Sequence, residues 1–282
     1  MVMKINSLVR CLLFCWMFLI AVCVNAQSSV VGVMGRSDTD GVDITAYYED
    51  VIRLALEKTR ASHGDFVIQQ RPFEASIDRV KAILQSSSGI DVIWASVTPE
   101  RMETMRYVQV DLLHELNNYR ALLIRKNDLE RFKGVNTLAD LHALKTGNGS
   151  SWTDTKVMQA NGFAVITAVD FGLLVKMLSA KRFDFITRGM HEIGMDLAMF
   201  PNANLAVVPN LVLKYSVPVR YGLFVRKTDE ILAQRLEQGL AQASADGSLQ
   251  KLFEHMSLFQ VGRKIMENKP RIIELDNSAV FH

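Results

Sequence analysis

Hydrophobic positions in the first third of this chain alternate between two spacings. Short apolar runs rich in β-branched and aromatic residues at 29–34, 66–70 and 90–94 predict strands. Apolar residues at helical spacing in 44–59 and 77–84 predict helices between them. Strands that alternate with helices indicate an α/β sheet, with ligand loops at the carboxyl ends of its strands.

The rest of the chain continues this alternation in a second series. The expected strands are 119–125, 163–169, 183–187 and 221–225, and the expected helices include 138–144 and 173–178. Residues 146–151 are rich in glycine and hydroxyl residues, which predicts a loop before a helix that ends at 161–162. No internal repeat or low-complexity linker separates the two series.

Turn and cap signals organise the C-terminal part. Thr228 is expected to cap a helix with Leu232 and Leu236 on its apolar face. Residues 246–248 are expected to turn into the last helix, and 271–275 to form an added edge strand.

The junction between the strand at 90–94 and the next expected helix holds a cation at a position where the helix dipole disfavours positive charge. Thr98 and Pro99 follow the strand at 90–94 and predict a helix start, with a hydroxyl at the N-cap and proline at the first position. Arg101 then falls in the first turn, where a positive charge costs roughly 0.3–1 kcal/mol against the helix dipole. A bound anion would explain this arginine. The alternative is a surface pair with Glu103 or Glu115.

The N-terminus has the pattern of a cleaved secretory signal. Lys4 and Arg10 precede an apolar run at 11–24, and Val24-Asn25-Ala26 places small residues where a signal peptidase cuts. The run is shorter than the ~20 residues of a spanning helix, although a membrane anchor stays the alternative. We therefore expect residues 1–26 to be a signal peptide and the mature chain to be soluble and exported, most simply to a bacterial periplasm.

Composition then narrows the chemistry of the mature chain. The three cysteines of the full sequence, at 11, 15 and 23, all lie in the leader, so thiolate metal sites, disulfides and cysteine nucleophiles are excluded from the mature chain. Without Lys4 and Arg10 the basic and acidic residues balance, so no nucleic-acid or membrane-surface partner is indicated. The six histidines show no ligand spacing, and no nucleotide-binding or hydrolase motif occurs. We expect no cofactor and no metal.

Three stretches resemble the periplasmic solute-binding proteins of polar amino acid importers. They are Gly89-Ile90-Asp91-Val92 with Thr98-x-x-Arg101, then Lys181-Arg182-Phe183-Asp184, and Tyr221-Gly222-Leu223 followed by Gly239-Leu240 and Asp246-Gly247-Ser248. The resemblance implies an α/β, two-lobed type II periplasmic-binding fold with two hinge crossings. Lobe one would comprise residues 27–118 and the return 217–282 with its C-terminal tail, and lobe two residues 119–216. The crossings are expected near 117–119 and 216–218.

The resemblance also implies roles for residues at the cleft. Arg101 would grip the α-carboxylate of the ligand, and Ser96 would add backbone and hydroxyl contacts. The loop with Gly149, Ser150 and Ser151 would meet the same carboxylate from lobe two. Simple helix capping is the alternative reading for the two serines, and both roles are compatible.

The sequence departs from the family pattern at one position. The acidic residue that takes the α-ammonium is Gly189 here, so Glu192 or Asp38 would have to substitute. Arg188, which precedes it, would favour a second anionic group if it faces the cleft, making a dicarboxylate plausible. The alternative for Arg188 is a solvated strand end.

Aromatic residues flank both proposed anion loops. Trp94 and Trp152, with Tyr48 as a further candidate, could hold the ligand's side chain, although a tryptophan that ends a buried strand is often a core residue. Trp152 is the stronger candidate because it lies in a polar loop.

We therefore expect an extracytoplasmic solute-binding protein that closes over an amino acid or dicarboxylate-like ligand for the permease of an ABC importer. The alternative is a secreted sensor subunit that presents the ligand to a membrane receptor. A periplasmic dehydratase-like enzyme is a further alternative, with Glu192, His191 and Asp38 as its only candidate acids and bases. His191 is expected at the surface.

Overall fold

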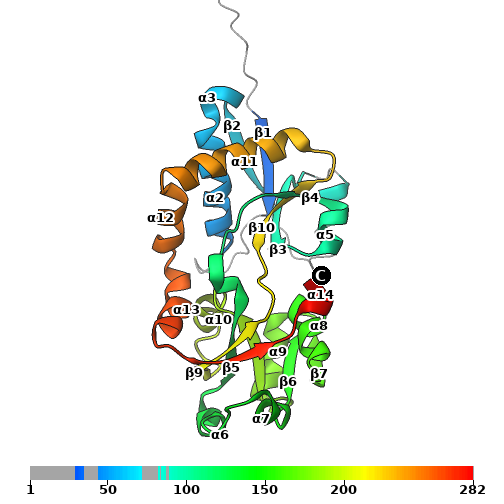
Figure 1. Cartoon of the computed structure of the whole chain (residues 1–282), viewed down its shortest axis with the longest axis vertical. Coiled ribbons are helices and arrows are strands. Elements are labelled where there is room, and N and C mark those ends of the chain that lie inside the picture. Colours follow the sequence, from blue (N-terminus) through cyan, green and yellow to red (C-terminus); the bar gives the residue numbers. More distant parts are fainter. Residues whose placement is uncertain (1–28, 35–43, 72–81, 83, 87–88, 282) are drawn as a thin grey trace, which may run out of the picture.

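The computed structural model describes residues 29–34, 44–71, 82, 84–86 and 89–281, which form two lobes, each built on its own sheet (Figure 1). The strands of the first sheet are, in spatial order, β2 (Phe66–Arg71), β1 (Ser29–Met34), β3 (Val92–Ser96), β10 (Tyr221–Arg226) and β4 (Met105–Val108). β10 is antiparallel to both β3 and β4. A segment from late in the chain therefore completes the first lobe, as expected for this α/β fold.

The second sheet has a different strand order and gains one strand from the tail. Its strands are, in spatial order, β11 (Arg271–Leu275), β9 (Leu205–Tyr215), β5 (Tyr119–Arg125), β8 (Phe185–Gly189), β6 (Thr146–Gly149) and β7 (Val165–Ala168). β11 pairs parallel with β9 along its whole length. The expected edge strand is therefore confirmed, but its place in lobe one is wrong, because it covers the otherwise unpaired edge of β9.

Helices cover the sheets of both lobes. Those of the first lobe are α2 (Thr45–Lys58), α3 (Arg60–His63), α5 (Pro99–Thr104), α11 (Glu230–Ala245) and α12 (Ser248–His255). Those of the second are α6 (Leu129–Phe132), α7 (Leu138–His142), α8 (Thr153–Ala160), α9 (Phe171–Ser179), α10 (Ile193–Met199), α13 (Ser257–Glu267) and α14 (Ser278–Phe281). Two short 3₁₀ helices, η1 (His114–Asn118) and η2 (Lys126–Asp128), flank β5.

The described chain passes between the lobes three times, one more than expected. The first two passes run from η1 into β5 and from β9 into β10, and Asn117 Nδ2 donates to Val219 O across them at 2.8 Å. The third leads from α12, which packs on α2 and α11, to α13, which packs on α10. Arg263 of α13 donates to the carbonyl oxygens of Phe253 and Glu254, both at 3.0 Å, and so fastens the end of α12.

Two local expectations are corrected. Residues 146–149 form the buried strand β6, so the loop before α8 is confined to 150–152. Glycine there lets aromatic rings lie on the strand: a Cβ at Gly147 would come within 2.3 Å of the Phe183 ring, and one at Gly149 within 2.3 Å of the Trp152 ring. The cap of α11 is Asp229, whose carboxylate accepts from the Leu232 amide at 3.2 Å, and not Thr228.

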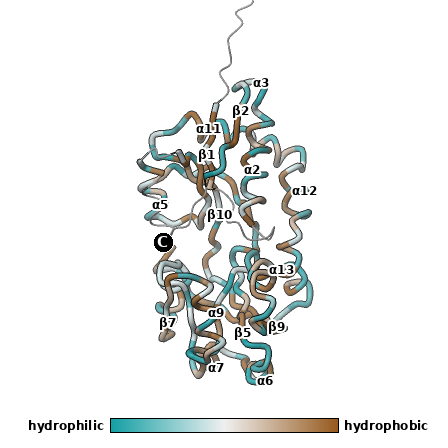
Figure 2. The backbone as a smooth tube through the Cα atoms, turned by 180° about the vertical axis from the view of Figure 1, so that it is seen from behind, coloured by the Kyte–Doolittle hydropathy of each residue, from teal (hydrophilic) through white to brown (hydrophobic). Residues whose placement is uncertain are grey.

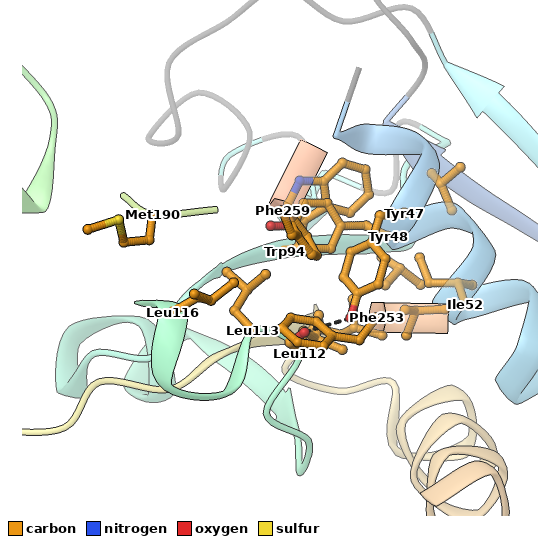
Figure 3. Packing of buried hydrophobic residues seen from close by; sticks show 14 of the residues in the cluster. Tyr47, Tyr48, Ile52, Trp94, Leu112, Leu113, Leu116, Met190, Phe253 and Phe259 are labelled. Carbon is orange, nitrogen blue, oxygen red and sulfur yellow. Dashed lines mark hydrogen bonds between the residues drawn. The ribbon is translucent and has the colours of Figure 1, made fainter. Parts of the chain in front are cut away.

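A hydrophobic cluster joins the lobes at the hinge. Tyr47 packs edge-on against Phe259 at 4.9 Å between ring centroids, and its hydroxyl donates to Leu112 O at 2.6 Å (Figure 3). A Cβ at Gly262 would come within 2.2 Å of Met190 O, so α13 approaches the second lobe backbone to backbone.

Hydropathy along the backbone agrees with this arrangement. The buried strands, such as β1, are hydrophobic, whereas α3 at the outer end of the first lobe is hydrophilic (Figure 2). Among the described residues no helix is both long and apolar enough to cross a bilayer, and the expected leader lies outside them.

Candidate ligand-binding cleft

A cavity of about 260 Å³ is lined by residues from both lobes. The first lobe and the hinge contribute Trp94, Ala95, Ser96, Arg101, Asn117 and Tyr221. The second contributes Arg120, Ser151, Trp152, Thr153, Asp154, Arg188, His191 and Glu192. The fold therefore brings six of the eight candidate residues from the sequence to one cavity; of the other two, Ser150 does not line it and Asp38 lies outside the described residues.

The corner between β3 and α5 positions Arg101 as the sequence indicated. Thr98 is the N-cap of α5, and its hydroxyl accepts from the Arg101 amide at 3.2 Å. The Arg101 guanidinium reaches back and donates to Ser96 O at 2.7 Å. That bond uses one of the five N–H donors of a guanidinium and holds the group at the wall of the cavity.

An aromatic stack supports the same wall. Trp94 stacks on Tyr48 with 4.9 Å between ring centroids, and Tyr48 stacks on Tyr221 at 5.6 Å. Trp94 is buried in the core of the first lobe and also lines the cavity, so both of its expected roles are compatible with the structure.

The loop before α8 differs from its expected arrangement. Ser151 and Trp152 line the cavity, but Ser150 is exposed and its amide donates to Ala168 O at 2.8 Å. Trp152 occupies the N-cap position and makes no side-chain capping bond, so helix capping by the serines is wrong. The Trp152 ring lies on Gly149, which places it between the β6 backbone and the cavity.

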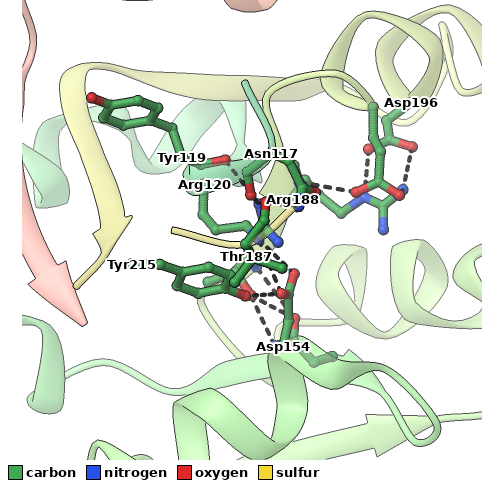
Figure 4. Close-up of polar contacts among 12 residues, drawn as sticks. Asn117, Tyr119, Arg120, Asp154, Thr187, Arg188, Asp196 and Tyr215 are labelled. Carbon is green, nitrogen blue, oxygen red and sulfur yellow. Dashed lines mark hydrogen bonds and ion pairs between the residues drawn. The ribbon is translucent and has the colours of Figure 1, made fainter. Parts of the chain in front are cut away.

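Arg188 is buried and its charge is matched within the protein (Figure 4). It is 5% exposed, and it donates to both carboxylate oxygens of Asp196 at 2.6 and 3.0 Å. Glu192 adds an ion pair at 3.2 Å, and the guanidinium lies 4.6 Å from the Trp152 ring centroid and 4.5 Å from that of Phe171. The solvated strand end is therefore wrong, and Arg188 carries no unmatched charge for a second ligand anion.

A second buried ion pair, centred on Arg120, was not predicted from the sequence. Arg120 Nε donates to both oxygens of Asp154 at 3.0 and 2.9 Å, and its Nη1 donates to Asn117 O at 2.7 Å (Figure 4). The Tyr215 hydroxyl also donates to Asp154. Burial raises the pKa of Tyr215 well above its usual range, which keeps that hydroxyl a donor. A charged residue near the start of an apolar strand, as Arg120 is in β5, was the available signal.

Gly189 leaves the space into which two neighbouring side chains fold. A Cβ at this position would lie 2.6 Å from His191 Cε1 and 2.9 Å from Glu192 Oε2. Glu192 accepts from the Gly189 amide at 3.0 Å. The carboxylate of Glu192 therefore lies beside the position where the family pattern has its acidic residue.

Glu192 and His191 have opposite environments. Burial raises the pKa of Glu192, but Arg188, His191 and Arg120 lower it more, so the net pKa is below its usual range and the side chain, 29% exposed, is ionised. Burial lowers the pKa of His191 to about 4, so its imidazole is neutral near pH 7. His191 is a buried residue, and the expectation of a surface position is wrong. Within the described ranges no group of three His, Cys, Asp or Glu side chains is arranged to hold a metal ion.

Comparison with known proteins places the fold. The sequence matches no protein family profile and no curated protein. A histidine kinase sensor domain with similarity to periplasmic binding proteins aligns with a TM-score of 0.58 and 17% identity, covering 80% of this chain and 94% of that one. An arginine-bound amino acid ABC transporter substrate-binding protein from Streptococcus pneumoniae aligns with a TM-score of 0.57 and 16% identity, covering 83% and 95%.

A third similar structure is an ancestral amino acid-binding protein, a precursor of cyclohexadienyl dehydratase. It aligns with a TM-score of 0.55 and 15% identity, covering 80% of this chain and 93% of that one. The chain therefore has the two-lobed fold of periplasmic amino acid-binding proteins, which confirms the expected fold class. At these identities the comparisons establish the fold alone.

Proposed function

We propose that this chain is an extracytoplasmic solute-binding protein that captures a small zwitterion, an amino acid or a close relative, between its lobes. One observation carries the proposal: a single cavity holds a guanidinium from the first lobe, Arg101, and a carboxylate from the second, Glu192. Its volume of about 260 Å³ is below the roughly 300–1,000 Å³ of sites for drug-sized ligands, which suits a small molecule.

The charges orient the ligand. Its α-carboxylate binds Arg101, because a guanidinium matches a carboxylate in both charge and shape. The Ser96 and Ser151 hydroxyls add donors from the two lobes. Its α-ammonium binds Glu192, which takes over the task of the acidic residue absent at Gly189. A dicarboxylate is disfavoured, because Arg188 is already paired with Asp196 and Glu192.

Ligand binding closes the lobes in this mechanism. The ligand binds first to Arg101 and Ser96 and then recruits Ser151 and Glu192 from the second lobe, which stabilises the closed form. Small-angle scattering should show a smaller radius of gyration with ligand than without. An unchanged scattering profile at saturating ligand would exclude closure.

The biological setting we propose is a periplasm, reached after removal of residues 1–26, with delivery to the permease of an ABC importer. The Streptococcus protein supports this role by analogy, and the histidine kinase sensor domain supports the alternative of a sensory subunit. A deletion strain separates the two. Lost uptake of labelled ligand would indicate an importer, and intact uptake with a lost transcriptional response would indicate a sensor.

We propose that binding occurs without turnover, although one similar structure is a dehydratase precursor. A general acid or base works best with a pKa near the working pH. The pKa of His191 is about 4 and that of Glu192 is lowered, so neither side chain is tuned for proton transfer near pH 7. Proton NMR of the bound ligand over a day should show a single unchanged compound, and any product would overturn this part.

Thermal-shift binding tests the central proposal. The mature chain, unfolded and refolded to strip resident ligand, is screened against amino acids and dicarboxylates. A ligand at 100 times its dissociation constant adds about 2.7 kcal/mol to the free energy of unfolding. Arg101→Ala should abolish the shift, while Arg53→Ala, which removes an exposed arginine on α2 paired with Glu49, should retain it. A shift that survives Arg101→Ala would contradict the proposed orientation.

A further inference from the structure

Two residues that line the cavity each have a buried polar atom without a hydrogen-bond partner within the described part of the chain. The atoms are Asn117 Oδ1 and His191 Nδ1. Asn117 is 1% exposed and His191 is 4% exposed, and both residues line the cavity. Buried polar groups in proteins are nearly always paired, and an unpaired one costs free energy comparable to a lost hydrogen bond. A bound group that satisfies both atoms would remove this cost.

The orientation of Asn117 is determined by its neighbour. Its Nδ2 donates to Val219 O at 2.8 Å, and a carbonyl oxygen can only accept. The unpaired Oδ1 is therefore an acceptor that requires a donor from the ligand.

The unpaired His191 nitrogen, unlike Asn117 Oδ1, can act as either a donor or an acceptor. A neutral imidazole has one donor nitrogen and one acceptor nitrogen, and the proton can occupy either one. The ring lies beside Tyr221, with 5.5 Å between ring centroids, and its Nδ1 lies 2.9 Å from the position that a Cβ at Gly189 would take. Its unpaired nitrogen can accept from a ligand N–H or donate to a ligand carbonyl.

The charges around these two atoms do not favour an ion. Arg120 is paired with Asp154, and Arg188 with Asp196. The carboxylates that line the cavity are Asp154, which is paired with Arg120, and Glu192, which holds the α-ammonium, so neither is left for a second ligand cation. A second ligand anion would find Arg120 and Arg188 already paired. A carboxamide is neutral and has both N–H donors and a carbonyl acceptor, so it complements Asn117 and His191 together.

We infer that His191 and Asn117 determine specificity for a ligand whose side chain ends in a carboxamide. This inference rests on the proposed function, in which Arg101 and Glu192 hold the α-carboxylate and α-ammonium. It adds a contact to the side chain of the same ligand and assigns that contact to His191 and Asn117.

Calorimetry with four ligands of similar length tests the inference. L-glutamine should bind stripped wild-type protein about ten-fold or more tightly than L-methionine, which lacks the amide, because unpaired buried groups discriminate strongly. It should also bind more tightly than L-glutamate and L-lysine, which carry a charge in the same place.

Two variants of His191 provide the matched comparison. His191→Phe keeps an aromatic ring but has no ring nitrogen. It should reduce the ratio of glutamine affinity to methionine affinity toward one while methionine binding persists. His191→Asn keeps a short amide near the Nδ1 position and should retain much of the ratio. Equal or tighter binding of methionine, glutamate or lysine by wild type would overturn the inference, as would an unchanged ratio in His191→Phe.

The test separates this inference from the proposed function. If methionine and glutamine bind equally and Arg101→Ala abolishes both, the carboxamide assignment fails while the proposed function stands. If no amino acid in the thermal-shift screen binds wild-type protein, the proposed function fails and the carboxamide assignment fails with it.

Discussion

Asn277 makes two hydrogen bonds to the backbone of Val217: its Nδ2 donates to the Val217 carbonyl at 2.9 Å, and its Oδ1 accepts from the Val217 amide at 2.8 Å. Asn277 is 0% exposed. Val217 lies in the second pass between the lobes, and Asn277 directly precedes α14 at the end of the chain. The C-terminal segment therefore belongs to the hinge as well as to the second sheet.

Asn277→Ala should destabilise the protein by roughly 2–4 kcal/mol, because it leaves the Val217 amide and carbonyl unpaired. Urea unfolding followed by circular dichroism measures this change in the free energy of unfolding. Asn268→Ala, an exposed change at the end of α13, should stay within about 0.5 kcal/mol of wild type. Equal effects of the two substitutions would show that the hinge contact contributes little.

Gly189→Ala should affect ligand binding more than stability. The added Cβ would meet the His191 ring at 2.6 Å and Glu192 Oε2 at 2.9 Å, and both are ends of side chains that can move aside. We expect a cost of about 1 kcal/mol in stability and a fall in amino acid affinity of about ten-fold or more, since the displaced groups no longer face the ligand.

Gly134→Ala is the matched control for that change, because a Cβ at Gly134 would meet nothing within 4 Å. Its affinity and thermal stability should equal those of wild type. Calorimetry on both variants decides the point: unchanged affinity in Gly189→Ala would show that His191 and Glu192 do not need their present positions.

Much of the fold was predictable from the sequence because it depends on local patterns. The apolar run at 90–94 and the Thr98 cap signal are each complete within a few residues. The strand forms as β3 at Val92–Ser96, two residues later than expected, and Thr98 caps α5 as expected. The same holds for Arg101, whose place at the first turn follows from Thr98 and Pro99.

The unpredicted parts depend on contacts between distant segments. β6 looked like a loop because its glycines are read as turn residues, yet the rings of Phe183 and Trp152 require them in a strand. The pairing of β11 with β9 and the third pass at α12–α13 arise from tail residues whose partners the local pattern does not specify. Arg188 likewise seemed available for a ligand because its partner Asp196 lies on α10 after a turn.

Asp154→Ala should be strongly destabilising. It removes the carboxylate partner of Arg120 and of the Tyr215 hydroxyl and leaves a guanidinium buried without its counter-charge. Breaking a buried ion pair on one side costs about 3–5 kcal/mol. Glu130→Ala breaks an exposed pair with Lys133 and should cost less than about 1 kcal/mol. Chemical unfolding of both variants tests this, and similar midpoints would contradict the central role of the Arg120 pair.

His191 should make the stability of the protein sensitive to acid. Its pKa is about 4 in the folded protein, below the ordinary 6.5. Between these values the unfolded chain binds a proton that the folded chain does not, so stability is fully present above pH 6.5 and falls as the pH drops toward 4. The slope is at most about 1.4 kcal/mol per pH unit.

His191→Asn cannot take up that proton, so its stability should lack this contribution. The free energy of unfolding of wild type minus that of His191→Asn should therefore decrease by roughly 2–3 kcal/mol from pH 7 to pH 4. Urea unfolding at half-unit steps of pH, with both proteins free of ligand, measures the difference directly. A difference that is independent of pH would mean that the imidazole titrates in the folded state as it does in water, and that its burial between Tyr221 and the cavity does not keep it neutral.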